Sequence, residues 1–177
     1  MLSQEVNISR DIQGIIDKSN RGVCIEIGSD SDSRNENHTF DFEDSAWITV
    51  CIQRDPEIFS NLRKHRRLCL NYNCCFSGGD NYRSLDSILE KTNLHKVDFI
   101  LTKNNALPLD VMDGFTPERW GTNLIVLDTP MRVRDSLVEK MSLHGFESIK
   151  RVWNSEFFVK TEEQRNLNAS LEDIFST

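Results

Sequence analysis

Acidic, amide and glycine residues directly follow the apolar runs of this sequence, and they could hold a small ligand. Five positions of this kind come after three such runs: Glu26, Gly28, Gln53, Asp55 and Asp80. Carboxylates and amides form hydrogen bonds with hydroxyl and amine groups, and glycine allows a ligand to approach the backbone closely. If the runs are parallel strands, these residues meet at the sheet edge where open α/β folds bind their ligands.

The loop after the first apolar run lacks the features of a phosphate site but has those of a possible metal site. Phosphate loops need several glycines, whereas residues 26–33 contain only Gly28 and carry Asp30 and Asp32, which repel an anion. Asp30-Ser31-Asp32 matches the paired carboxylates that hold a divalent metal and a nucleotide sugar in many glycosyltransferases. A solvated acidic loop explains the same tripeptide, and we predict no metal site.

Three further clusters have a structural as well as a functional interpretation. Residues 63–67, RKHRR, could dock an acidic or phosphorylated partner, or stabilise the carboxyl end of a helix. Gly78-Gly79-Asp80 could approach a ligand or form a turn. The five cysteines are odd in number and lack the spacing of a metal site, so we expect structural thiols.

The composition excludes several classes of protein. The chain has 177 residues with 21 basic and 28 acidic side chains, and its net charge of −7 disfavours nucleic acid as a partner. It contains no run near the roughly 18 apolar residues of a membrane span. Residues 1–13 lack the basic start and apolar core of a secretion signal. We therefore expect a cytoplasmic protein with one domain at 1–160, including an N-terminal helix within 1–20, and a polar tail at 161–177.

Apolar runs and helical periodicities alternate along the chain and would position the candidate residues. Five runs are typical of buried strands: 23–28, 47–52, 68–76, 97–101 and 124–127. Helical spacing of apolar residues predicts five helices: 4–19, 56–62, 84–91, 107–112 and 131–143. Asp55 is a natural N-cap for the second helix, with Pro56 at its first position. A hairpin of strands 146–152 and 156–159 follows, and the polar residues 29–46 break the pattern.

This alternation predicts an α/β fold. Alternating elements give a mostly parallel sheet with helices on both faces, and the terminal hairpin makes the sheet mixed. Trp47, Trp120 and Trp153 lie beside apolar runs, so we expect all three as core anchors. Cys24 and Cys51 lie inside strands and are predicted to be small buried side chains.

The order of the segments resembles the FkbM-type family of class I S-adenosylmethionine-dependent methyltransferases over residues 22–160. The similar stretches are Glu26-Ile27-Gly28, Asp55-Pro56 with the helix after it, 97–101 leading to 111–115 and 118–120, and 144–146 followed by 156–159. The resemblance implies a Rossmann-like methyltransferase fold with a C-terminal antiparallel hairpin. It also implies methyl transfer to an oxygen of a small-molecule or glycan substrate.

The resemblance also assigns roles to individual residues. In such a fold the first three strand exits hold the methionine end, the ribose and the adenine of S-adenosylmethionine. The implied cofactor-binding residues are Glu26, Gly28, Gln53 and Asp80, with Asp55 in reserve.

This sequence departs from the family at three strand exits. A second glycine falls near Asp32, the ribose-binding acid falls on Gln53, and an Asp-x-Glu-Gly turn falls on residues 103–106, KNNA. An amide can still bond a ribose diol, although a bond to a charged group is about twice as strong.

Two functions from different classes therefore remain open. A working methyltransferase needs little covalent chemistry, because it aligns a nucleophile with the methyl group and excludes water. Its catalytic residue is unknown, and Asp30, Asp128 and His38 are the candidate proton acceptors. The alternative is a catalytically inactive pseudo-methyltransferase that binds proteins or serves as a scaffold through residues 161–177 or 63–67.

Overall fold

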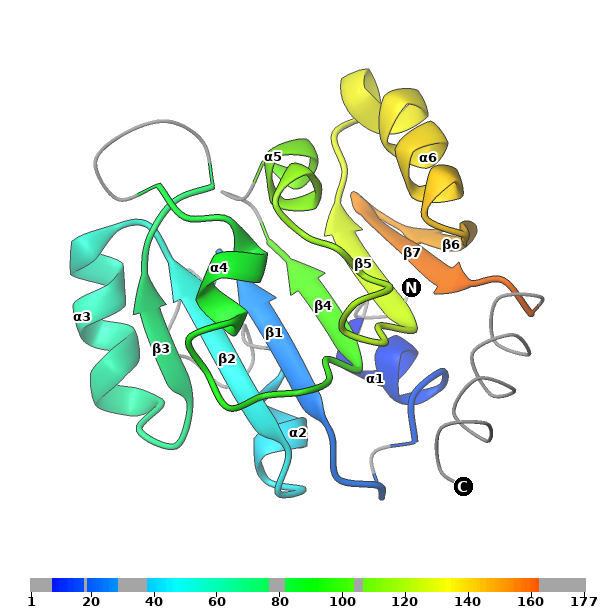
Figure 1. Ribbon diagram of the computed structural model, residues 1–177. Helices are drawn as coiled ribbons and strands as arrows, with labels where there is room; N and C mark the ends of the chain where they lie inside the picture. Colours follow the sequence, from blue (N-terminus) through cyan, green and yellow to red (C-terminus); the bar gives the residue numbers. More distant parts are fainter. Residues whose placement is uncertain (1–7, 18, 29–37, 77–81, 104–106, 163–177) are drawn as a thin grey trace, which may run out of the picture.

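A seven-stranded sheet forms the centre of the molecule (Figure 1). The computed structural model describes residues 8–17, 19–28, 38–76, 82–103 and 107–162. The strands are β1 (Val23–Ile27), β2 (Ile48–Gln53), β3 (Leu70–Asn73), β4 (Phe99–Thr102), β5 (Leu124–Asp128), β6 (Phe146–Val152) and β7 (Ser155–Lys160). Their order is β3-β2-β1-β4-β5-β7-β6, with β1 to β5 parallel and β7 antiparallel to both of its neighbours. The predicted mixed sheet with a C-terminal hairpin is confirmed.

Helices cover both faces of this sheet, as the alternation predicts. One face carries α4 (Leu85–Leu89), α5 (Pro108–Asp113) and α6 (Arg134–Leu143), which follows the short 3₁₀ turn η1 (Met131–Val133). The other face carries α1 (Ile8–Gln13), α2 (Phe40–Glu43) and α3 (Pro56–His65). The longest described helices, α3 and α6, have 10 residues each, and no described helix is long and apolar enough to cross a membrane.

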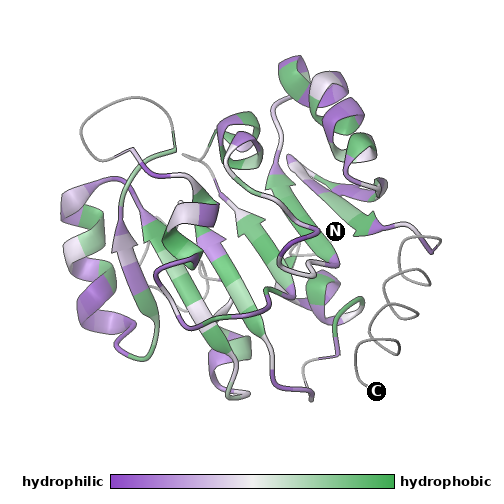
Figure 2. Ribbon diagram, in the orientation of Figure 1, coloured by the Kyte–Doolittle hydropathy of each residue, from purple (hydrophilic) through white to green (hydrophobic). Residues whose placement is uncertain are grey.

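The central strands are apolar on both faces because both faces are covered. All four residues of β4 are buried, and so are the first four of β5. Figure 2 shows the strands as mainly hydrophobic, whereas the helices carry hydrophilic residues on part of their surface. A near-continuous apolar run is the expected pattern for a parallel strand between two helical layers.

The parallel strands give the sheet two distinct edges. The carboxyl ends of β1 to β5 lie along one edge, which we call the carboxyl edge, and their amino ends lie along the amino edge. The β6–β7 turn also lies at the carboxyl edge, because Ser155 at the start of β7 pairs with Asp128 at the end of β5.

The polar stretch 29–46 contains an element that the sequence does not predict. Within it, α2 buries Phe42 completely, and the Phe42 ring lies 5.1 Å from Trp47 and 4.8 Å from Phe99, measured between centroids. One turn of helix is too short to give a periodic signal in the sequence. The stability of α2 depends instead on tertiary contacts such as these. At the other end of this face, α1 spans only Ile8–Gln13 of the predicted 4–19, and residues 1–7 lie outside the described ranges.

Trp153 is not a core anchor, in contrast to Trp47 and Trp120, which are buried as predicted. It lies in the two-residue turn between β6 and β7, is 80% exposed and has a positive φ of 58°. Turn residues of a hairpin project beyond the sheet, so the neighbouring apolar strands do not bury this ring. Cys24 and Cys51 are fully buried in the sheet, as predicted.

Candidate functional site

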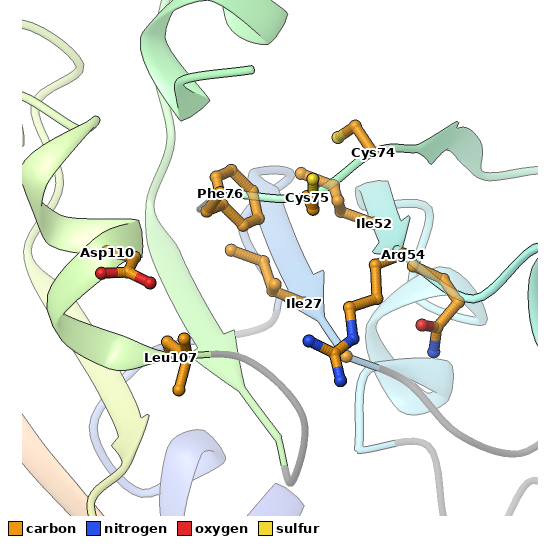
Figure 3. Close-up of a pocket in the computed structure, with 10 residues that line it drawn as sticks. Ile27, Ile52, Arg54, Cys74, Cys75, Phe76, Leu107 and Asp110 are labelled. Carbon is orange, nitrogen blue, oxygen red and sulfur yellow. The ribbon is translucent and has the colours of Figure 1, made fainter. Parts of the chain in front are cut away.

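A hollow opens at the carboxyl edge, where β1, β2 and β3 end and α5 begins (Figure 3). Its apolar wall is formed by Ile27, Ile52, Cys74, Phe76 and Leu107, and its remaining lining by Gly28, Gln53, Arg54, Cys75 and Asp110. In Figure 3 Asp110 and Arg54 lie on opposite sides of Ile27. The hollow thus presents an apolar surface flanked by one acidic and one basic side chain.

The hollow is shallow. Its cavity volume is about 30 Å³, far below the usual range for ligand pockets. That volume holds about two water molecules. A nucleoside could therefore lie against the apolar wall, but it would fill the floor only if side chains moved.

Gly28 shapes the rim of the hollow, as the sequence predicts. Its φ of 80° lies in the left-handed region, which glycine adopts without a steric penalty. Its amide donates a 2.9 Å hydrogen bond to the carbonyl of Ile52, so the chain turns away from β1 while still tied to β2. The first strand exit therefore presents bare backbone to the hollow.

Gln53 lines the hollow at the end of β2, but its amide oxygen has a structural partner. The side chain is buried, and Oε1 accepts a 3.0 Å hydrogen bond from the backbone amide of Asp55. Asn73 at the end of β3 donates a 2.8 Å bond to the Gln53 carbonyl. Gln53 therefore shapes the second exit as well as facing the hollow.

Asp55 caps a helix and is not among the residues that line the hollow. Its carboxylate accepts from the amides of Glu57 and Ile58 at 2.9 and 3.0 Å, and Pro56 occupies the first turn of α3. This is the N-cap geometry that the sequence predicts.

Glu26 points away from the hollow into a buried ionic cluster. Its carboxylate is fully buried and accepts a 2.8 Å bond from Arg66 and a short bond from Thr39. Burial acts to raise the pKa of Glu26, but the charges of Arg66 and Lys103 and these hydrogen bonds outweigh it and lower the pKa. The structure thus separates the Glu26 carboxylate from Gly28, which lines the hollow two residues later.

Arg66 belongs to this cluster although it lies in the basic run 63–67. Its side chain is fully buried, it also pairs with Glu43, and its guanidinium lies 4.5 Å from the centroid of the Phe40 ring. The exposed part of the run is therefore Arg63, Lys64, His65 and Arg67. Nothing local in the sequence distinguishes Arg66 from its neighbours, because its partner Glu26 lies 40 positions earlier in the chain.

The remaining predicted positions are dispersed. Asp30, Asp32 and Asp80 lie outside the described ranges, as do residues 104–106, whereas Lys103 and His38 are half-buried. Among the described residues, no cluster of histidine, cysteine and acidic side chains could hold a metal ion.

Asp128 lies at the carboxyl end of β5, two strands away from β1 in the sheet. It is half-buried, and its backbone amide donates a 2.9 Å bond to the Thr102 hydroxyl at the end of β4. Burial raises the pKa of the Asp128 carboxyl, and the charge of Arg151 opposes this only in part.

Several lining residues were not identified as candidates from the sequence. Arg54 lies between the predicted strand 47–52 and the predicted helix 56–62, and Leu107 is the first residue of the predicted helix 107–112, so strand and helix boundaries were a usable signal for both. Phe76 falls inside the predicted strand 68–76, whereas β3 ends at Asn73 and leaves it beyond the sheet. Asp110 lies in the first turn of α5, where only the docking of that helix brings it to the hollow.

No protein-family model and no curated protein matches the sequence. The structure, in contrast, is similar to solved methyltransferases. The TehB-like SAM-dependent methyltransferase from Corynebacterium glutamicum is 12% identical with a TM-score of 0.60, over 89% of each chain. The METTL16 MTase domain is 12% identical with a TM-score of 0.57, over 86% of this chain and 63% of that one.

A third similar structure contains a cofactor product. TrmK from M. capricolum, solved with S-adenosyl-homocysteine, is 9% identical with a TM-score of 0.53, over 87% of this chain and 66% of that one. This chain thus spans less than two thirds of the METTL16 chain and nearly all of the TehB-like one. Together with the strand order, these likenesses show that the chain has the class I S-adenosylmethionine-dependent methyltransferase fold.

Proposed function

We propose that this protein binds S-adenosylmethionine in the carboxyl-edge hollow and methylates an oxygen of a small-molecule or glycan substrate. The observation that carries the proposal is the position of the hollow: in a sheet of order 3-2-1-4-5-7-6, it lies at the exits of β1 and β2, beside the left-handed glycine Gly28. The acceptor and the oxygen specificity rest on the resemblance to FkbM-type enzymes.

The residues of the hollow suit the chemistry of a nucleoside. Ile52 and Phe76 offer apolar surface for the flat face of an adenine ring, and the bare backbone of Gly28 allows close approach. Gln53 lies at the β2 exit, where the resemblance places the ribose. Asp110 provides a carboxylate that can accept hydrogen bonds from hydroxyl or amine groups. Asp80 remains a proposed adenine contact outside the described ranges.

The bound cofactor would supply an electrophilic methyl group, so the protein's task is to position the acceptor and remove its proton. Among the candidate proton acceptors, Asp128 is half-buried at the carboxyl end of β5, on the edge where the hollow lies. Burial raises its pKa, which moves the carboxyl toward the range where a general base works well at neutral pH.

The alternative function, a pseudo-methyltransferase, also has specific observations in its favour. The cavity volume of the hollow is only about 30 Å³, and the Glu26 carboxylate is held by Arg66 outside the lining. A protein that keeps the fold without the cofactor would retain the sheet and its helices but show no response to cofactor.

Thermal denaturation with S-adenosylmethionine and S-adenosylhomocysteine tests the proposal. Ligand at 100 times its dissociation constant adds about 2.7 kcal/mol to the free energy of unfolding. For a chain of 177 residues we expect a rise in Tm of roughly 5–10 °C. An unchanged Tm at millimolar concentrations of both ligands contradicts cofactor binding and supports the pseudo-methyltransferase.

A matched pair of variants locates the ligand. Gly28→Trp should abolish the ligand-induced shift, because the new ring fills the rim of the hollow. Gly121→Trp is the control, since Gly121 also has a positive φ, 61°, but lines a different surface at the amino edge. Both variants place a bulky side chain at a glycine with a left-handed φ. A loss of the ligand-induced shift in Gly28→Trp alone would therefore locate the ligand in the hollow.

A further inference from the structure

A second and larger concavity lies at the amino edge of the sheet, opposite the hollow. This groove has a volume of about 950 Å³ and runs between the segment after α1, the starts of β2, β4 and β5, and the end of β7. Its size is at the upper end of the range for ligand pockets. A groove of this size can accommodate a segment of chain.

The groove has an apolar floor. Trp47, Trp120 and Val159 are each less than a tenth exposed and form its base, and Ile15 stands on its wall with 38% of its surface exposed. Large apolar side chains beside a concavity of this size are typical of a surface that binds an amphipathic segment.

The rim of the groove carries balanced charge, with Arg21, Lys96 and Arg119 set against Asp17, Asp98 and Glu118. Asp98 pairs with Lys96 at 2.8 Å, and Glu118 bonds His144 at 3.0 Å, whereas Asp17 accepts bonds from the uncharged Ser19 amide and Asn20 side chain. Within the described ranges, Arg21 and His95 form no ion pair and no side-chain hydrogen bond. The apolar floor, and not the charge of the rim, therefore determines which segment fits the groove.

The chain itself supplies an acidic amphipathic segment next to this groove. The last described residue is Glu162, three positions after Val159 of the groove floor, and the Thr161 amide donates a 2.9 Å bond to the carbonyl of Gly145. In residues 163–177 four apolar residues have helical spacing: Leu167, Leu171, Ile174 and Phe175. The same segment contains three acids and one arginine, a net charge of −2.

We propose that residues 163–177 bind in the amino-edge groove as an amphipathic helix. Its apolar side would cover Trp47, Trp120 and Ile15, and Glu172 and Asp173 would lie near Arg21. The segment is thereby an intramolecular ligand of the domain, in place of the free partner-binding tail expected from the sequence. This proposal does not depend on cofactor binding, because the hollow lies at the other edge of the sheet.

The covalent connection makes even a weak contact effective. A short flexible linker gives an effective concentration on the order of millimolar. A contact with a dissociation constant of about 0.1 mM as a separate peptide would then be occupied about nine tenths of the time within the chain. The test must therefore be made in the intact protein.

Hydrogen–deuterium exchange of the full chain, compared with a chain that ends at Glu162, tests the proposal. We expect the amides of residues 14–21 and 118–123 to exchange at least tenfold faster in the shortened chain. A photo-reactive phenylalanine analogue in place of Leu171 should cross-link within the same molecule to residues 15–21 or 118–124. Equal exchange in the two chains, or cross-links only to other surfaces or to a second copy, contradicts the proposal.

Matched substitutions separate docking from general damage. Leu171→Asp with Ile174→Asp should reproduce the fast exchange, whereas Ala169→Asp, on the opposite side of the predicted helix, should not. On the domain, Ile15→Asp should also expose the groove, and Ile149→Asp on β6, where the side chain is 50% exposed, is its control. Equal effects of the paired variants would overturn the assignment of the groove.

Discussion

Asp55 and Gln53 show how a residue near a binding site can be committed to the fold. Both follow β2, where the resemblance places the ribose, yet Asp55 uses its carboxylate to cap α3. Gln53 in turn accepts from the Asp55 amide and so holds the cap in place. The N-cap was predictable from sequence because the signal is local, whereas the link between the two residues was not.

Replacing Asp55 should affect stability and leave ligand binding unchanged. Asp55→Ala should lower the free energy of unfolding by about 1 kcal/mol, the usual cost of removing an N-cap. Urea denaturation measures this loss, and Asp55→Ser should recover most of it, since serine also caps helices. A tenfold loss of S-adenosylhomocysteine affinity in both variants would show that Asp55 contacts the ribose. Helix capping alone would then not account for the role of this residue.

Trp153 occupies a backbone conformation that suits glycine. Its φ of 58° is left-handed, which costs a residue with a Cβ roughly 1–2 kcal/mol. Its ring is 80% exposed, so packing within the described part of the molecule compensates little of that cost.

Trp153→Gly should therefore stabilise the protein. We expect a gain of about 0.5–1 kcal/mol, because relief of the left-handed strain exceeds the extra chain entropy of glycine. Thermal and urea denaturation check this, with Asn154→Gly as the control in the same turn, since Asn154 has no left-handed φ. A stability below that of the wild type would show that the indole makes a compensating contact.

At the scale of elements, the C-terminal hairpin and α6 are joined by one buried carboxylate. Glu156 of β7 accepts two bonds from Arg134 of α6, at 2.7 and 3.0 Å, and one from Arg151 of β6 at 2.7 Å. Ser148 donates a further short bond. Burial acts to raise the pKa of Glu156, but the bonds from Arg134, Ser148 and Arg151 lower it to about 2.

This carboxylate should make stability depend on pH between its unfolded and folded pKa. Because the folded pKa is the lower one, the contribution is complete above pH 4.5 and is lost as the pH falls toward 2. Glu156→Gln should cost on the order of 2–3 kcal/mol at pH 7. Urea denaturation at pH 7, 4 and 2.5 should show the difference from wild type shrinking with acidity; a constant difference would contradict an ionic role.

The elements also show which sequence signals were sufficient. The hairpin, the α3 cap and the end of α5 before Gly114 were predictable because turn, cap and glycine signals lie within a few residues. The helix α2 was not, because a single turn is held by Phe42 packing on residues far along the chain.

At the scale of the whole molecule, the sequence predicted the kind of sheet and which strand ends meet at one edge, but not how the lining of the hollow is composed. Parallel strands must present their exits at one edge, so the order of the segments alone was enough to place Gly28 and Gln53 together. The Glu26–Arg66 pair and the position of Asp110 depend on how helices dock on the sheet. Contacts between such distant segments leave no periodic signal in a single sequence.

The unequal exposure of the three indoles has a practical consequence. Trp47 and Trp120 are shielded, whereas Trp153 stands in solvent at the β6–β7 turn, on the side of the sheet where Asp128 ends β5. A soluble quencher such as iodide will reach that single fluorophore and spare the other two. Its emission is therefore a built-in optical reporter for molecules that bind near the β6–β7 turn.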